Sequence, residues 1–177
     1  MSFLLDLPLR NTLLSPQKLV ARLPLTAMSV VLEVGVGSGF YSVEVARTVS
    51  KGHLELLDLQ LEMLKKAQQK LNAKGLPNAG YTHADACKLP FKEHTFDLIF
   101  LVTVLGEIAD QRAFLSEAHR VLKPEGMLSV SEHHPDPDFS PLTEVKLLVE
   151  KEGFEFLERY GGRWSYTVNF RKSETTP

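Results

Sequence analysis

The chain has 177 residues, of which 44% are apolar and 24% are charged, the composition of an ordinary globular protein with a single domain. Its formal net charge is −2, so it lacks the basic excess that neutralises nucleic-acid phosphates, and we expect no nucleic-acid partner. The single cysteine, Cys87, excludes an intramolecular disulfide. With no signal-peptide pattern and no apolar run long enough to span a membrane, the chain is predicted to be cytoplasmic.

The chain is expected to form a single domain, residues 1–177, in which the N-terminal stretch covers the core. Residues 1–29 would form a cap or lid, and residues 30–177 the core. The apolar opening "MSFLLDLPLRNTLL" has two interpretations: it packs over the domain, or it forms a lid for a substrate or lipid, which leaves peripheral membrane contact open. Ser15 as N-cap and Pro16 at the first helical position predict a short helix before the first strand.

Short apolar runs alternate with longer helical patterns along the chain, which is typical of βαβ units and predicts an α/β fold with a mostly parallel sheet. Strands are expected at residues 30–34, 53–58, 78–85, 95–105 and 127–132, with helices at 41–49, 61–75, 110–126 and 140–154. The last helix should start at a second Ser-Pro pair. Residues 154–172 are predicted to form two antiparallel strands joined by a short connection at Gly161-Gly162.

The segment "VLEVGVGSGF", residues 31–40, places three glycines directly after the first strand. Ligands of open α/β sheets bind at this edge of the sheet. The spacing misses the dinucleotide pattern G-x-G-x-x-G by one position, and no Gly-Lys-Ser or Gly-Lys-Thr of a P-loop follows. Glu33 would repel a pyrophosphate and attract an ammonium or a sulfonium. The segment therefore favours a cationic cofactor.

Two aspartates end the next two predicted strands. Asp58 ends the second strand, where a carboxylate can accept hydrogen bonds from two ribose hydroxyls. Asp85 ends the third strand, within reach of a nucleoside base. Either residue alone would be typical of a helix N-cap or a solvated strand end. Together with the glycine loop they indicate a nucleoside-containing ligand.

Four stretches then identify a family resemblance: "VLEVGVGSGF", "LDLQLEMLKKAQ", "HADACKLPFKEHTFDLIFLVTVLGEI" and "EAHRVLKPEGMLSVSE". In this order, over residues 30–132, they resemble a class I S-adenosylmethionine-dependent methyltransferase similar to the ubiquinone and menaquinone biosynthesis group. The resemblance implies a Rossmann-like three-layer sandwich with a seven-stranded sheet of order 3-2-1-4-5-7-6, strand 7 antiparallel. It also implies S-adenosylmethionine as cofactor and S-adenosylhomocysteine as product.

The resemblance assigns cofactor contacts position by position. The methionine end would face Glu33 and the main chain of the glycine turn, at Gly35, Val36, Gly37 and Gly39. The ribose and adenine would be held by Asp58, Leu59, Asp85 and the main chain at Ala86. The floor of the site would come from the main chain around Leu101 and Val102.

The catalytic residues remain open at this point, because in-line methyl transfer depends mainly on alignment and needs no obligatory dyad. Candidates for a base are Glu107, after the fourth strand, and Glu132, His133 and His134, after the fifth. Nothing in the sequence ranks them. Related enzymes often carry histidine or an aromatic residue where this chain has Gly106-Glu107, which leaves the acceptor undetermined.

The stretch "EHHPDPDF" combines two histidines and two aspartates, but no metal site is predicted there. Adjacent side chains of an extended segment point in opposite directions, and the two prolines favour a turn. A substrate-facing loop and a merely solvated turn are the remaining interpretations.

The leading hypothesis is a methyltransferase for a small or lipid-like acceptor, favoured slightly over a protein acceptor. The regions that would enclose the acceptor are short, so the pocket should be shallow, or closed by the N-terminus or by another subunit. One alternative is a non-catalytic scaffold or partner subunit that binds S-adenosylmethionine. The other is an NAD-dependent oxidoreductase on a similar sheet. The sequence leaves the oligomeric state open.

Overall fold

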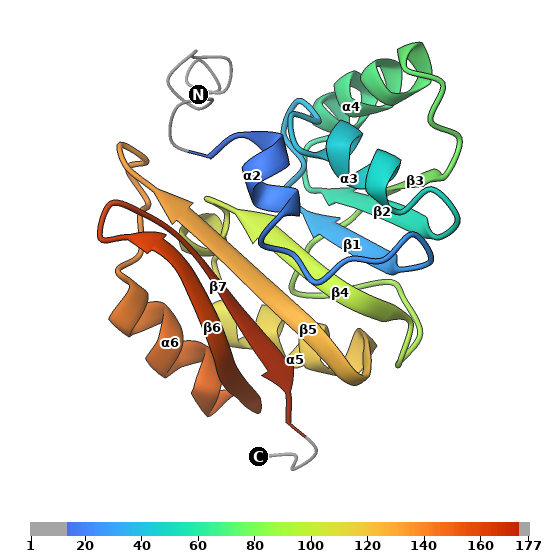
Figure 1. Ribbon diagram of the computed structural model, residues 1–177. Coiled ribbons are helices and arrows are strands. Elements are labelled where there is room, and N and C mark those ends of the chain that lie inside the picture. The colour runs from blue at the N-terminus through green and yellow to red at the C-terminus, as the bar shows by residue number, and fades with distance from the viewer. Residues whose placement is uncertain (1–13, 174–177) are drawn as a thin grey trace.

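A seven-stranded sheet forms the centre of the computed structural model, which describes residues 14–173 (Figure 1). The strands are β1 (Val30–Val34), β2 (His53–Asp58), β3 (Ala79–His83), β4 (Phe96–Val102), β5 (Leu122–His133), β6 (Phe154–Gly162) and β7 (Ser165–Lys172). The helices are α2 (Pro16–Val20), α3 (Ser42–Thr48), α4 (Leu61–Ala73), the 3-10 turn η1 (Leu105–Glu107), α5 (Gln111–Val121) and α6 (Leu142–Lys151). The strand order is β3-β2-β1-β4-β5-β7-β6, and only the pairs that include β7 are antiparallel. The expected fold class and strand order are confirmed.

Helices cover both faces of the sheet. Figure 1 shows α2, α3 and α4 on one face and α5 and α6 on the other. Strand β4 is buried on both sides, since Ile99 and Leu101 join one apolar cluster while Leu98 and Phe100 join the other. This double burial explains why its sequence is a continuous apolar run and does not alternate with polar residues.

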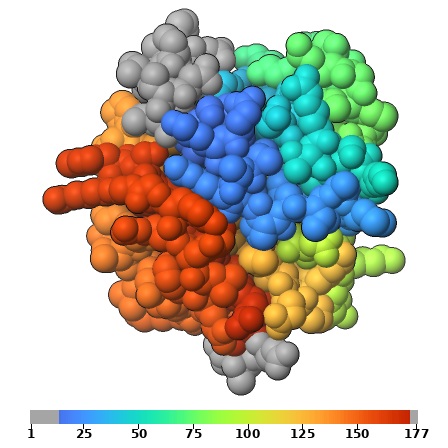
Figure 2. Space-filling model, in the orientation of Figure 1, coloured from blue at the N-terminus to red at the C-terminus, as the bar shows by residue number. Residues whose placement is uncertain are grey.

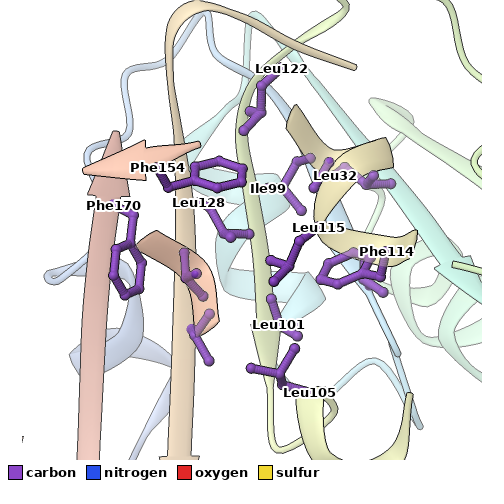
Figure 3. Packing of buried hydrophobic residues seen from close by; sticks show 14 of the residues in the cluster. Leu32, Ile99, Leu101, Leu105, Phe114, Leu115, Leu122, Leu128, Phe154 and Phe170 are labelled. Carbon is purple, nitrogen blue, oxygen red and sulfur yellow. The ribbon is translucent and has the colours of Figure 1, made fainter. Parts of the chain in front are cut away.

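The α5 side of the core illustrates how helical spacing creates a buried stripe. Phe114 and Leu115 point from α5 toward Ile99 and Leu101 of β4 (Figure 3), and all four are almost completely excluded from solvent. Complete burial of such a side chain contributes about 1.5–3 kcal/mol. The helical pattern predicted for this segment is therefore confirmed, although α5 ends at Val121.

The short helix α2 starts as predicted. The Ser15 hydroxyl accepts a hydrogen bond from the Lys18 N–H at 3.2 Å, and Pro16 occupies the first turn. Figure 2 shows this segment on the surface between α3 and the β6–β7 pair. The Arg22 guanidinium donates to the Thr167 hydroxyl of β7 at 3.1 Å, which fastens the segment to the sheet. The rest of the predicted lid, residues 1–13, lies outside the described residues.

The fifth strand is longer than predicted. It begins at Leu122, directly after α5, and reaches His133, whereas the sequence pattern indicated residues 127–132. Its pairing with β4 shifts between Phe96 and Leu98, so Pro124 and Gly126 are accommodated in an irregular stretch and do not separate helix from strand. Antiparallel pairing with β7 continues to His133. Glu132 and His133 thus lie inside the strand, and their predicted place after it is wrong.

The predicted turn at Gly161-Gly162 is also wrong. Both glycines belong to β6, and the two-residue turn is Arg163-Trp164. Gly161 has φ +85°, and a Cβ atom there would collide with the Ser165 carbonyl oxygen of the partner strand. The close approach of β7 therefore requires a glycine at this position.

Other element ends differ from the sequence pattern by a few residues. β3 ends at His83, before Asp85, and β4 ends at Val102 because Thr103 adopts a positive φ of 53°. Helix α6 starts after Pro141 without a side-chain cap, so the second Ser-Pro pair does not repeat the cap of the first. Across residues 14–173, no helix is long and apolar enough to cross a membrane.

Asn78 provides a test of how α3 is joined to the sheet. Its side-chain amide donates to the Ala46 and Val49 carbonyls, each at 2.9 Å, near the C-terminal end of α3. Asn78→Ala should lower the free energy of unfolding by about 1–2 kcal/mol, because helix-end carbonyls lose their donors. Urea denaturation measures this loss. Asn72→Ala, on the exposed face of α4, is the matched control, and equal stability of both variants would contradict the assignment.

Candidate functional site

A cavity of about 590 Å³ opens at the carboxyl ends of β1, β2 and β4, where open α/β sheets bind ligands. Its walls come from the glycine turn after β1, the loops after β2 and β3, η1 and the loop between β5 and α6. The predicted cofactor residues that line it are Glu33, Gly35, Val36, Gly37, Asp58, Leu59, Asp85, Ala86 and Val102. The sheet thus brings together side chains from four separate parts of the chain.

Two predicted cofactor positions do not line the cavity. Leu101 is 1% exposed and belongs to the core cluster on the α5 side of the sheet. Gly39 packs the end of the glycine turn against α4. A Cβ atom at Gly39 would lie only 3.0 Å from the Cα and Cβ of Ala67, so a glycine permits this packing. These two residues support the site through packing.

The glycine turn is required by backbone geometry. Gly35, Gly37 and Gly39 have φ values of 72°, 54° and 70°, in the left-handed region that other residues adopt only with strain. A Cβ atom at Gly35 would also collide with the Val104 side chain. The turn therefore exposes main chain to the cavity without side chains in between.

Glu33 lies in the wall of the cavity as a buried carboxylate. It is 3% exposed, and its Oε2 atom has no hydrogen-bond partner. Burial raises the pKa of Glu33 to about 8, the Ser42 hydroxyl lowers it, and the nearby Asp58 carboxylate raises it further. An ammonium group placed beside Oε2 would supply both the missing hydrogen-bond donor and the opposite charge.

Asp58 connects the glycine turn to the loop after β2. Its Oδ2 accepts from the Gly37 N–H at 3.1 Å, and its Oδ1 accepts from the Gln60 N–H at 2.8 Å. A carboxylate has about four acceptor positions, so two stay available for hydroxyls of a ligand. Leu59 follows at once and is 69% exposed, which leaves an apolar surface for a flat ring.

Asp85 and Cys87 form the wall after β3. The Asp85 Oδ1 accepts from the Cys87 N–H at 2.8 Å and thereby holds the loop in a turn. Burial is the main cause that raises the pKa of the Cys87 thiol, and neighbouring aspartates raise it further. A raised pKa keeps the sulfur protonated, which argues against a nucleophilic role.

The four candidates for a catalytic base are separated by the fold. Glu107 lines the cavity, whereas Glu132, His133 and His134 do not. His133 is 5% exposed inside β5, and the His134 ring lies tilted against Phe139 and edge-on to Trp164, with centroid distances of 4.1 and 4.8 Å. The two histidines therefore contribute to packing beside the loop.

Sequence reasoning missed Thr103, Ile108, Asp136 and Asp138 as cavity residues. The stretch "EHHPDPDF" had suggested a substrate-facing loop, and it is the aspartates, not the histidines, that face the cavity. No cluster of three or more His, Cys, Asp or Glu side chains suited to a metal ion occurs within residues 14–173.

With this geometry in hand, comparison with known proteins identifies the family. Residues 31–126 match the family described as a methyltransferase domain. The chain belongs to this methyltransferase family. A similar solved structure is a SAM dependent methyltransferase from Aquifex aeolicus, with a TM-score of 0.87, 29% identity and 95% coverage of both chains. The family and this structure imply S-adenosylmethionine as the cofactor.

Curated relatives within the methyltransferase group are similar over part of their length. A ubiquinone/menaquinone biosynthesis C-methyltransferase of Vibrio vulnificus is 38% identical over 133 residues, 74% of this chain and 50% of its own. A demethylmenaquinone methyltransferase of Geobacillus kaustophilus is 36% identical over 97 residues, 54% of this chain and 42% of its own. The chain thus spans about half the length, or less, of these relatives.

The residues of the cavity fit S-adenosylmethionine. The unpartnered Oε2 of buried Glu33 suits the ammonium of the amino-acid end, and the bare glycine turn leaves room for it. Asp58 has acceptor capacity for ribose hydroxyls, and exposed Leu59 offers an apolar face for adenine. A pyrophosphate would instead meet the Asp58 carboxylate and would oppose ionisation of Glu33.

Glu33→Gln tests the role of the buried carboxylate. Because the folded pKa of about 8 lies above the ordinary value of 4.5, Glu33 is protonated in the free protein near neutral pH. An adjacent ammonium favours the ionised form, so affinity for S-adenosylhomocysteine should rise up to about tenfold per pH unit from pH 6 to 8. In the variant the affinity should be lower and this slope absent, as measured by calorimetry.

The same variant should be more stable without ligand. Unfolding releases the Glu33 proton between pH 4.5 and about 8, so the folded form loses stability as pH rises through this window. The free energy of unfolding of Glu33→Gln should therefore exceed that of the unmodified protein by about 1–3 kcal/mol at pH 7. Glu62→Gln, exposed on α4, is the control. If the affinity of Glu33→Gln for S-adenosylhomocysteine kept the same dependence on pH, Glu33 would not be part of the binding site.

Asp58→Ala tests the predicted ribose contact. The substitution removes a buried acceptor, so S-adenosylhomocysteine should bind about 1–3 kcal/mol more weakly. Thermal unfolding of the free variant separates this effect from the lost support of the Gly37 and Gln60 amides. Unaltered affinity would exclude Asp58 from cofactor binding.

Proposed function

We propose that this chain is an S-adenosylmethionine-dependent methyltransferase that acts on a small or lipid-like acceptor. The observation that carries the proposal is one continuous cavity with two differently built halves. One half contains buried Glu33, the glycine turn and Asp58, which suit the cofactor. The other half, which η1 and the loop between β5 and α6 line, would hold the acceptor.

The protein's contribution to such a reaction is alignment. The cofactor supplies a methyl group on a positively charged sulfur, which an acceptor can attack in line. Glu33 and the main chain of the glycine turn would hold the amino-acid end, while Asp58 fixes the ribose. Side chains of the second half, including Val104 and Ile108, would exclude water and hold the acceptor against the methyl group. Holding two reactants in register can supply on the order of 7–11 kcal/mol.

The acceptor class is supported by the cavity and by the relatives' names. A volume of about 590 Å³ must hold both cofactor and acceptor, which favours a small acceptor or the head of a lipid-like one. Two of the curated relatives are named for ubiquinone/menaquinone biosynthesis and for demethylmenaquinone. A quinol is therefore one of the acceptors to test first.

A thermal-shift and turnover experiment tests the function. S-adenosylmethionine and S-adenosylhomocysteine should each raise the melting temperature at about 1 mM, and NAD should not, because binding to the folded state alone stabilises it. Formation of S-adenosylhomocysteine is then followed over quinols, phenols and amines. Tight cofactor binding without turnover on any acceptor would favour a non-catalytic scaffold. Stabilisation by NAD alone would contradict the proposal.

A further inference from the structure

The acceptor half of the cavity is lined by carboxylates. Among residues 14–173, the lining includes six acidic side chains and no Lys, Arg or His; the acidic ones are Glu33, Asp58, Asp85, Glu107, Asp136 and Asp138. The first three belong to the cofactor half. The other three come from η1 and the loop between β5 and α6, which enclose the acceptor half.

The loop that carries two of these carboxylates is held in place by its own hydrogen bonds. The Asp136 N–H donates to the His133 carbonyl at 3.2 Å, and the Asp138 N–H donates to the Asp136 Oδ1 at 3.0 Å. The Phe139 ring lies against the rings of His134 and Tyr166, with centroid distances of 4.1 and 6.0 Å. The main chain of the loop and the Asp136 carboxylate are thus held in place at the cavity.

The absence of a side chain at Gly106 lets the two walls meet. A Cβ atom there would collide with the Asp138 carbonyl oxygen and would lie 3.0 Å from the Asp138 Cβ. Any larger residue at position 106 would push the loop away from η1. Gly106 therefore brings the acidic loop against the cavity.

Glu132 lies in β5 next to the acidic loop but does not line the cavity. It is 1% exposed, and the Ser140 main chain is its hydrogen-bonding neighbour. Burial, and then Asp136, Glu107 and Asp138, raise the pKa of Glu132 to about 8, while the Ser140 main chain partly offsets them. Among the described residues, no salt bridge joins Glu132, Asp136 or Asp138 to a basic side chain.

We propose that the methyl acceptor is a small molecule that carries a protonated amine, held in the acceptor half by Asp136 and Asp138 together with Glu107. The inference rests on the proposed function and narrows its substrate class. A cation gains attraction from these carboxylates, a neutral acceptor gains none, and an anion is repelled. The charge of the wall thus selects among acceptors of equal size.

The same carboxylates suit the chemistry of an amine. The ammonium first loses one proton to a carboxylate of the wall, which passes it to water. The nitrogen lone pair then forms the N–C bond, while the C–S bond breaks and its electron pair remains on sulfur. The product is a methylated ammonium together with neutral S-adenosylhomocysteine. No further reactant is needed.

Three probes of one shape but different charge test the inference: 2-phenylethylamine, 2-phenylethanol and phenylacetate. Calorimetry measures their binding to the protein saturated with S-adenosylhomocysteine at low and high salt. The amine should bind at least about tenfold more tightly than the alcohol, phenylacetate should bind most weakly, and the difference should shrink in high salt. Methyl transfer should be detected with the amine.

Asp136→Asn and Asp138→Asn should each weaken binding of the amine. The combined variant should weaken it by about tenfold or more. Binding of the alcohol and of S-adenosylhomocysteine should stay within about twofold. In Asp136→Asn the new amide oxygen can still accept the hydrogen bond from the Asp138 N–H, so the loop can keep its fold. Glu150→Gln, an exposed carboxylate on α6, is the charge-matched control and should alter none of these values.

Several results would overturn the inference. These are equal binding of amine and alcohol, a preference for phenylacetate, an equal loss for all probes in the aspartate variants, or methyl transfer to a quinol but to no amine. Each of them leaves the proposed function in place. Failure of S-adenosylhomocysteine to bind the unmodified protein would contradict the proposed function itself, and the inference with it.

Discussion

The buried carboxylate of Glu33 is the constraint on which the rest of the site depends. A carboxylate that is 3% exposed and lacks a partner at one oxygen opposes folding as soon as it ionises. It is kept at the end of β1, beneath a turn of left-handed glycines that leaves the oxygen open to the cavity. Such an arrangement is understandable if a cation completes it. Stability of the free protein would thereby be exchanged for affinity.

At several positions a glycine is needed because a side chain would prevent two segments from packing closely. Gly35 and Gly39 allow the turn to pack against Val104 and against α4, so the main chain can reach a ligand. Gly106 allows the acidic loop after β5 to close against η1. In each case a missing side chain creates a close approach of two segments that are distant in sequence. The shape of the cavity follows from these approaches as much as from the residues that line it.

Much of the proposed cofactor half could be predicted, because its signals are local. Strand ends at Glu33 and Asp58 follow from short apolar runs, and the glycine turn is visible in the sequence. The acceptor half was predicted less well. His133 and His134 were candidates, but neither lines the cavity: His133 is buried inside β5, and the His134 ring lies against Phe139 and Trp164. Asp136 and Asp138 reach it instead, because their loop folds back on Gly106.

Local patterns in the chain were sufficient to establish the succession of strands and helices, the cap at Ser15 and the preference for a cationic cofactor over a phosphate. These features depend on the spacing of apolar residues and on charges within a few residues of each other. The ends of β5 and β6, the residues of the turn before β7 and the set of carboxylates that meet at the cavity became visible only in three dimensions. They depend on contacts between distant segments, whose geometry no local pattern specifies.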